Sequence, residues 1–106
     1  MKNEWTLASN RSRGKTDGVT VTKVTDGFTV YRYIEDWDEE GDTIYAVDEY
    51  LMDISEKELK LAIGAQSDAD VIRWIKAHLI KKQSNSLEAI VRFLDEHKVP
   101  YTYSST

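Results

Sequence analysis

Apolar and polar residues alternate along the first half of the chain, which is the pattern of strands with one buried face. Residues 19–25 (VTVTKVT) and 28–34 (FTVYRYI) are rich in β-branched and aromatic side chains, and Asp26-Gly27 lies between them. Asp-Gly readily adopts the positive φ angles of a two-residue type I′ turn. We therefore predict a hairpin that turns at Asp26-Gly27 and pairs Val21 with Arg32.

The two faces of this hairpin differ in polarity. The expected core face carries apolar residues interrupted by two cations: Val19, Val21, Phe28, Val30, Ile34, Lys23 and Arg32. The opposite face carries threonines and leaves Tyr31 and Tyr33 half exposed. A further strand is expected over about residues 43–50 and a fourth over residues 4–9, with residues 10–18 (NRSRGKTDG) as a basic loop.

The second half of the chain changes to a helical period. Ser55 and Glu58 form a capping-box pattern at the start of a short helix, and Gly64 is placed to end it. Ser67 is placed to cap a second helix. The apolar face of that helix repeats at i, i+3, i+4, i+7 and i+8: Val71, Trp74, Ile75, His78 and Leu79. A third helix has its apolar stripe at Leu87, Ile90, Val91 and Leu94.

Pro100 ends the last helical segment, and the residues around and after it (VPYTY, 99–103) are typical of a short strand at a sheet edge. Strands followed by helices, with one strand returning, indicate an α+β fold. We expect one domain over residues 1–106. It should contain an antiparallel sheet of three to five strands, with two or three helices packed on one face.

Charge is distributed unevenly along the chain. The 106 residues carry a net charge of −5, yet residues 35–58 hold eleven acids and one base, Lys57, which gives this segment a charge of −10. Its most acidic stretch, residues 35–42 (EDWDEEGD), has a tryptophan near its centre. Such a segment repels nucleic acid and attracts basic proteins, chiefly by accelerating their encounter.

The sequence contains no recognisable catalytic or cofactor motif. It has no cysteine, which excludes disulfide and thiolate chemistry, and no serine lies in a nucleophile elbow. His78 and His97 lack partners at metal-binding spacing. Arg11, Arg13 and Lys15 could hold phosphates, although three bases in one loop are common. We expect a protein that is not an enzyme and that needs no cofactor or metal.

Calcium binding is one alternative for the acidic stretch. Asp36, Asp38, Glu40 and Gly41 match the opening of an EF-hand loop, but Val47 stands at the twelfth position, where a bidentate Glu belongs. The flanking segments also have strand patterns where an EF-hand has helices. A solvated hairpin loop or a protein-binding loop therefore fits this stretch better.

Trp37 favours the protein-binding interpretation. An exposed indole gains nothing in a solvated loop, whereas an aromatic anchor ringed by charge is typical of a binding hot spot. The alternative, in which Trp37 folds back as a lid over Tyr31 or Tyr33, stays open. The candidate binding residues are the indole, acids in and after this stretch and two tyrosines: Asp36, Trp37, Asp38, Glu39, Glu40, Asp42, Asp48, Glu49, Tyr33 and Tyr45.

The sequence also bears on location. No segment approaches the ~20 apolar residues of a membrane span. Residues 1–10 (MKNEWTLASN) lack the apolar core of a signal peptide. We expect a cytoplasmic protein that binds no membrane and no nucleic acid and is monomeric by default.

In kind, these features resemble the small acidic immunity proteins that bacteria make against secreted nuclease toxins, including those of contact-dependent inhibition systems. The resemblance lies in small size, absence of cysteine and an aromatic residue within a carboxylate cluster. It implies an inhibitor that binds a basic toxin domain by pairing Asp and Glu with cations that otherwise hold phosphates. Two other interpretations remain: a regulatory or accessory domain of bacterial or phage origin that binds by a sheet edge or helix face, and, less favoured, a nucleic-acid mimic.

Overall fold

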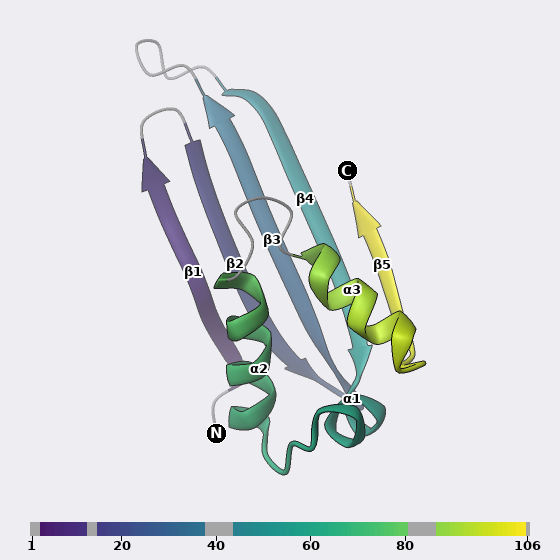
Figure 1. The fold of residues 1–106 in the computed structure, drawn as a ribbon. Coiled ribbons are helices and arrows are strands. Elements are labelled where there is room, and N and C mark those ends of the chain that lie inside the picture. Colours follow the sequence, from purple (N-terminus) through teal and green to yellow (C-terminus); the bar gives the residue numbers. More distant parts are fainter. Residues whose placement is uncertain (1–2, 13–14, 38–43, 81–86, 106) are drawn as a thin grey trace.

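The computed structural model describes residues 3–12, 15–37, 44–80 and 87–105, and the side chains within these ranges except those of residues 8–15, 37–46 and 80. The described residues form one antiparallel sheet and three helices (Figure 1). The strands lie side by side in sequence order: β1 (Glu4–Ser12), β2 (Lys15–Val24), β3 (Gly27–Trp37), β4 (Ile44–Ser55) and β5 (Tyr101–Ser105).

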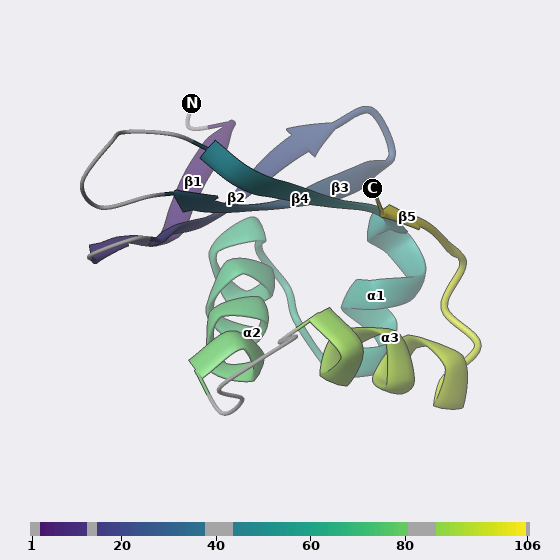
Figure 2. The same ribbon diagram turned by 90° about the horizontal axis from the view of Figure 1, so that it is seen from above.

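The helices lie between β4 and β5 in the chain, and all three lie on one side of the sheet (Figure 2). They are α1 (Glu56–Ile63), α2 (Asp68–Ile80) and α3 (Leu87–Glu96). The other face of the sheet carries no helix of the described chain. The expected α+β fold, with helices on one face and a short C-terminal strand, is confirmed.

The core fills the space between the sheet and the helices, because the apolar sides of both meet there. Its buried residues come from β2 to β4, all three helices and the segment before β5: Val19, Val21, Phe28, Val30, Met52, Ile54, Leu59, Val71, Ile72, Ile75, Leu79, Leu87, Ile90, Leu94 and Val99. Trp74 and Val91, expected in this core, are partly buried at its margin. Ile34 is half-buried and lies outside it.

The β2–β3 hairpin forms, but its register differs from the expected one. Val24 pairs with Gly27 and Val21 with Val30, which makes Thr25 and Asp26 the two turn residues. A shift of two residues returns every side chain to its original face, so the expected core face is preserved. The positive φ angle is at Asp26, 64°. Gly27 has a different role, because a Cβ atom there would lie 2.6 Å from the carbonyl oxygen of Ile54.

Several strands are longer than the pattern predicted. β4 runs on to Ser55, and most of the expected basic loop between residues 10 and 18 belongs to β1 and β2, with residues 13–14 outside the described part. The acidic stretch begins on β3, which ends at Trp37. A register shift in the β3–β4 pairing leaves Tyr45 without a directly opposite residue.

Two of the predicted helix caps, at Gly64 and Ser67, form in the structure. Gly64 adopts a left-handed conformation after α1, with φ of 71°, and Ala65 N–H donates to the Lys60 carbonyl. Ser67 caps α2 by accepting a hydrogen bond from the Asp70 N–H at 3.2 Å. Ser55 precedes α1 as expected, but its hydroxyl donates to the Glu58 carboxylate and makes no side-chain cap bond to the helix backbone.

Candidate functional site

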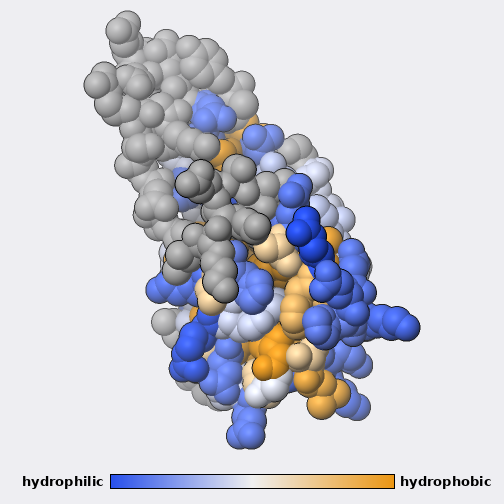
Figure 3. All heavy atoms as spheres, in the orientation of Figure 1, coloured by the Kyte–Doolittle hydropathy of each residue, from blue (hydrophilic) through white to orange (hydrophobic). Residues whose placement is uncertain are grey.

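The sheet is longer than the helical layer that covers it. Figure 1 shows the helices over the lower part of the sheet, while the upper ends of β1 to β4 extend past them. On the helix side, apolar surface gathers in the lower part of the molecule among hydrophilic side chains (Figure 3). No described helix lies over the upper part of β3 and β4 in Figure 1.

The β3–β4 pairing brings several of the predicted binding residues together on this extension. Tyr33 lies opposite Glu49, and Ile34 lies opposite Asp48. Glu35 and Asp36 follow on β3. We call this group the acidic sheet end: Tyr33, Glu35, Asp36, Asp48 and Glu49. Side-chain alternation divides it between the two faces, with Tyr33, Glu35 and Glu49 on the uncovered face and Asp36 and Asp48 on the helix side.

The uncovered face joins these acids to aromatic and apolar surface. Tyr31 and Tyr33 are half-buried on β3, and Val47 and Leu51 on β4 are each 41% exposed. Tyr31 lies diagonally across from Glu49. Burial and then the negative charge of Glu49 raise the pKa of Tyr31. The face thus offers ring surface next to carboxylates. The sequence pattern predicted the half-exposed position of Tyr31 and Tyr33.

Tyr33 and Glu35 form a fixed pair on this face. The Tyr33 hydroxyl donates a hydrogen bond to the Glu35 carboxylate. This bond, with some burial and the carboxylate charge, raises the pKa of Tyr33 to about 12. Tyr33 therefore stays neutral at physiological pH, and its hydroxyl holds the Glu35 carboxylate in one orientation.

The helix side of the extension also contains a buried cation. Arg32 is 7% exposed and donates to both carboxylate oxygens of Asp17, through Nη2 at 2.9 Å and Nε at 3.3 Å. This bidentate pair gives the buried guanidinium a charged partner. Within the described part of the chain, no ion pair involves Asp36 or Asp48.

The remaining predicted binding residues lie partly or wholly beyond what the structure describes. Asp38, Glu39, Glu40 and Asp42 are outside the described residues. Trp37 and Tyr45 belong to β3 and β4, but their side chains are not described. The choice between an anchor and a lid for Trp37 therefore stays a prediction, as does the membership of these six residues in the site.

Metal chemistry finds no support in the described residues. They contain no group of three or more His, Cys, Asp or Glu side chains arranged to hold a metal ion. The first and twelfth positions of the EF-hand alternative, Asp36 and Val47, lie in the paired strands β3 and β4. Strands flank this segment in place of the two helices of an EF-hand.

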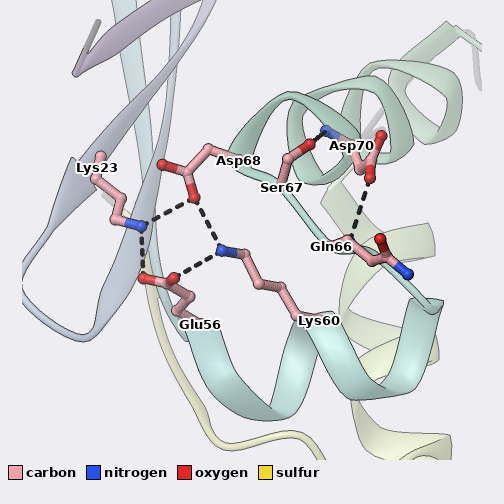
Figure 4. Close-up of polar contacts among 7 residues, drawn as sticks. All are labelled: Lys23, Glu56, Lys60, Gln66, Ser67, Asp68 and Asp70. Carbon is pink, nitrogen blue, oxygen red and sulfur yellow. Dashed lines mark hydrogen bonds and ion pairs between the residues drawn. The ribbon is translucent and has the colours of Figure 1, made fainter. Parts of the chain in front are cut away.

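A second charged cluster, which sequence reasoning missed, joins β2 to α1 and α2 (Figure 4). Lys23 contacts Glu56 at 2.6 Å and Asp68 at 2.9 Å, and Lys60 contacts the same two carboxylates at 2.8 and 3.0 Å. We call these four residues the ion tetrad. Its only signal in the sequence was Lys23, a cation interrupting the apolar face of a strand.

The tetrad has balanced charge and shifts the pKa of each member. The hydrogen bond from Lys23 is the largest factor that lowers the pKa of Glu56 and of Asp68. The hydrogen bond to Glu56 is the largest factor that raises the pKa of Lys60. Burial lowers the pKa of Lys23, but its bonds to Glu56 and Asp68 outweigh that effect and raise it overall. Two cations facing two anions make this cluster a link between elements, with no excess charge to attract a ligand.

The described helices include none that is both long and apolar enough to cross a membrane. In comparisons with known proteins, no family model matches the chain, and no curated protein or solved structure matches it significantly.

Proposed function

We propose that this chain is a protein-binding inhibitor of the immunity-protein kind, which neutralises a basic, nuclease-type toxin domain through its acidic sheet end. The observation that carries the proposal is the placement of Glu35, Asp36, Asp48 and Glu49 beside Tyr33, on strands that extend past the helices. Carboxylates on both faces of the β3–β4 pair suit a partner whose Lys and Arg side chains lie around a groove that binds nucleic acid.

The physical basis is charge pairing at a surface that needs little rearrangement. Lys and Arg of the partner can pair with carboxylates that β3 and β4 already hold at fixed spacing. The hydrogen bond from Tyr33 restrains Glu35 before binding, which lowers the ordering cost on association. Tyr33 itself adds ring surface of the kind that concentrates binding energy. We place this activity in the cytoplasm, where a chain without cysteine needs no oxidising environment.

The test pairs the chain with a candidate toxin, the protein encoded by the gene beside its own. The toxin domain is expressed in a bacterial host with wild-type chain or with Asp48→Lys, and growth and the association rate of the purified proteins are measured. We expect wild-type chain to restore growth. Asp48→Lys should slow association about tenfold at low salt, because it reverses a charge that steers the partner.

The matched control is Glu96→Lys, which makes the same charge change on an exposed residue at the end of α3. It should leave the association rate within about twofold of wild type, since it lies on another part of the molecule. If both variants slowed association equally, the change in net charge of the whole chain would explain the effect, and the proposed site would be contradicted. A neighbouring gene product that is neither toxic nor bound by the chain would contradict the proposed function.

A further inference from the structure

The uncovered face of the sheet, opposite the three helices, carries most of the large apolar side chains that the described structure exposes (Figure 2). Val24 on β2 and Val47 and Leu51 on β4 point to this face and are 40–41% exposed. The two other large exposed side chains, Leu61 and Tyr103, lie on α1 and on the helix side of β5. Exposed apolar side chains that gather on one face indicate a docking surface, whereas single scattered ones do not.

Tyr31 and Leu51 form the middle of this face. They lie directly opposite each other on β3 and β4, and the same row continues to Thr20 on β2 and Ser104 on β5. Opposite residues of an antiparallel pair have Cβ atoms about 4.5–5.5 Å apart, so the tyrosine ring and the leucine side chain are neighbours. The flanking residues of the row are short hydroxyl side chains, which leaves this aromatic and aliphatic pair accessible to a side chain of a partner.

The charge of the uncovered face is negative wherever its side chains are described. Side-chain alternation places carboxylates on this face and, among the described side chains, no Lys or Arg: the carboxylates are Glu4, Glu35, Glu49 and Asp53. The described cations of the strands, Lys23 and Arg32, lie on the helix side. Both form ion pairs there, Arg32 with Asp17 and Lys23 within the ion tetrad. The two faces of the sheet therefore differ in charge as well as in cover.

Hydroxyl groups hold two of these carboxylates in place. Glu35 accepts a hydrogen bond from the Tyr33 hydroxyl. Asp53 accepts hydrogen bonds from the hydroxyls of Thr29 and Thr102. A hydroxyl donor orients a carboxylate but leaves its negative charge in place, whereas a Lys or Arg donor also neutralises it. The uncovered face thus combines oriented negative charge with exposed apolar surface.

Resting on the function proposed above, we infer that the basic partner lies across the uncovered face and places an apolar side chain against Tyr31 and Leu51. Lys or Arg side chains of the partner pair with Asp53 on one side of this contact and with Glu35 on the other. Asp53 lies opposite position 29 of β3, so the two carboxylates are separated by the rise from position 29 to position 35, about 20 Å. A protein surface of ordinary interface size covers that span, and a single cationic side chain does not.

The charge of this face disfavours its other candidate occupants. Two copies of the chain packed through the uncovered face would bring carboxylates toward carboxylates, and like charges across an interface oppose association. Nucleic acid is repelled by the same carboxylates. A basic protein surface with an apolar side chain among its cations complements both the charge and the apolar centre of the face.

Two exposed leucines provide a matched pair of variants for the test. Leu51→Ala truncates the side chain at the centre of the uncovered face, and Leu61→Ala makes the same change on α1, where the leucine is 75% exposed. Binding to the toxin domain encoded by the neighbouring gene is measured for both variants, and circular dichroism verifies their fold. We expect Leu51→Ala to weaken binding about fivefold or more, chiefly through faster dissociation, and Leu61→Ala to stay within about twofold of wild type.

A second measurement does not depend on the toxin. Two peptides with blocked ends, Lys-Leu-Lys-Leu-Lys and Lys-Ser-Lys-Ser-Lys, carry the same charge and differ in apolar surface. Their binding to the whole chain is followed by NMR through the chemical shifts of the backbone amides. We expect the leucine peptide to shift the amides of Tyr31 and Leu51, to leave that of Leu61 unchanged, and to bind about fivefold or more tightly than the serine peptide.

The outcomes separate this inference from the proposed function. If wild-type chain binds the toxin but Leu51→Ala and Leu61→Ala bind it equally well, the docking face is overturned and the function stands. Equal binding of the two peptides, shifts centred on the helices, or no binding would overturn the docking face whatever the toxin does. Binding of the leucine peptide at Tyr31 and Leu51 beside a neighbouring gene product that does not bind would support the face and contradict the function. Shifts at these amides that grow with protein concentration, without peptide, would identify a second copy as the occupant and overturn the basic partner.

Discussion

Gly27 is required by a close contact with β4, although its place after Asp26 suggests a role in the turn. Asp-Gly is a strong turn signal, but the positive φ angle belongs to Asp26. Gly27 pairs with Ser55 and approaches the neighbouring carbonyl of Ile54 so closely that a methyl group would lie 2.6 Å away. Glycine is needed there because a backbone from β4 occupies the space of a side chain.

We expect Gly27→Ala to lower the free energy of unfolding by about 1–3 kcal/mol, because the new Cβ atom forces two strands apart. Gly27→Asn should be no better tolerated, since Asn carries the same Cβ atom. Urea unfolding followed by circular dichroism measures both effects.

Gly64 provides the contrasting case, because it has a left-handed φ angle and nothing within 4 Å of an added Cβ atom. Gly64→Ala should cost about 1–2 kcal/mol, and Gly64→Asn less, because Asn tolerates this conformation. If Gly27→Asn were clearly more stable than Gly27→Ala, the φ angle, and not the contact with Ile54, would make glycine necessary at position 27.

At the scale of residues, the sequence predicted the helix caps, which depend on near neighbours, and missed the contacts between residues that are distant in the chain. Gly64 and Ser67 act within one helical turn, so their roles follow from their immediate neighbours in sequence. Gly27 lies against Ser55 and Ile54 of β4, residues distant in sequence whose approach no local pattern contains. The pairing of Lys23 with Glu56 and Asp68 depends on how three elements pack together, which no local pattern contains.

At the scale of elements, α3 shows how an amphipathic stripe becomes buried surface. Leu87, Ile90 and Leu94 recur at helical spacing, and all three are fully buried. By contrast, Leu61 on α1 is 75% exposed. The two helices thus provide a buried and an exposed aliphatic residue within the same layer.

Ile90→Ala should lower the free energy of unfolding by about 2–5 kcal/mol, because it removes buried carbon and leaves a cavity. Leu61→Ala, a truncation of similar size, should change it by no more than about 0.5 kcal/mol. Chemical denaturation of the two variants in parallel gives the comparison. A loss below about 0.5 kcal/mol for Ile90→Ala would contradict the placement of α3 on the sheet.

Element type followed from periodicity, whereas element ends did not. The sequence pattern placed the end of the third strand near Tyr50. In the structure the strand continues to Ser55, with Met52 and Ile54 buried. Asp53 takes the uncovered face between them and accepts hydrogen bonds from Thr29 and Thr102 on the neighbouring strands. Pairing on both sides of β4 therefore extends it beyond its local preference.

At the scale of the whole molecule, the ion tetrad links the sheet to the two helices that follow it. Glu56 and Asp68 have lowered pKa values in the folded chain, below their ordinary values of 4.5 and 3.8. A carboxylate with a lowered folded pKa stabilises the fold above its unfolded pKa and loses that effect as pH falls through the folded pKa. The stabilisation by the tetrad should therefore be present at neutral pH and be lost progressively as pH falls below about 4 and through the lowered pKa values of the two carboxylates.

The variant Asp68→Asn tests this pH dependence. Its free energy of unfolding should lie about 0.2–1 kcal/mol per lost pair below wild type at pH 7, because the tetrad is partly exposed to solvent. At pH 3 the difference should shrink toward zero. In a Lys23→Met background the effect of Asp68→Asn should also be smaller, since one of its two cations is already gone. A difference that does not vary between pH 3 and 7 would contradict an electrostatic role.

The candidate site was only partly predictable for a reason that appears at this largest scale. Sequence alone located the acid and the aromatic residues, and it placed Tyr33 on a half-exposed face. It assigned Asp36 to a loop, whereas the residue lies in β3, and Glu35 was left out of the site. Whether a strand residue is covered depends on how much of the sheet the helices cover. That extent is set by tertiary packing, which composition and hydrophobic periodicity do not reveal.

The position of the three helices between β4 and β5 also has a consequence for the order of assembly. β1 to β4 can pair through neighbouring turns as the chain emerges, but β5 reaches β4 only after the helices have been made. Until then the outer side of β4 is unprotected along its full length. The newly made domain passes through a stage at which off-pathway pairing competes with closure by β5. Slower docking of Tyr101–Ser105 would lengthen that stage and increase aggregation during synthesis. The stability of the finished molecule would not change.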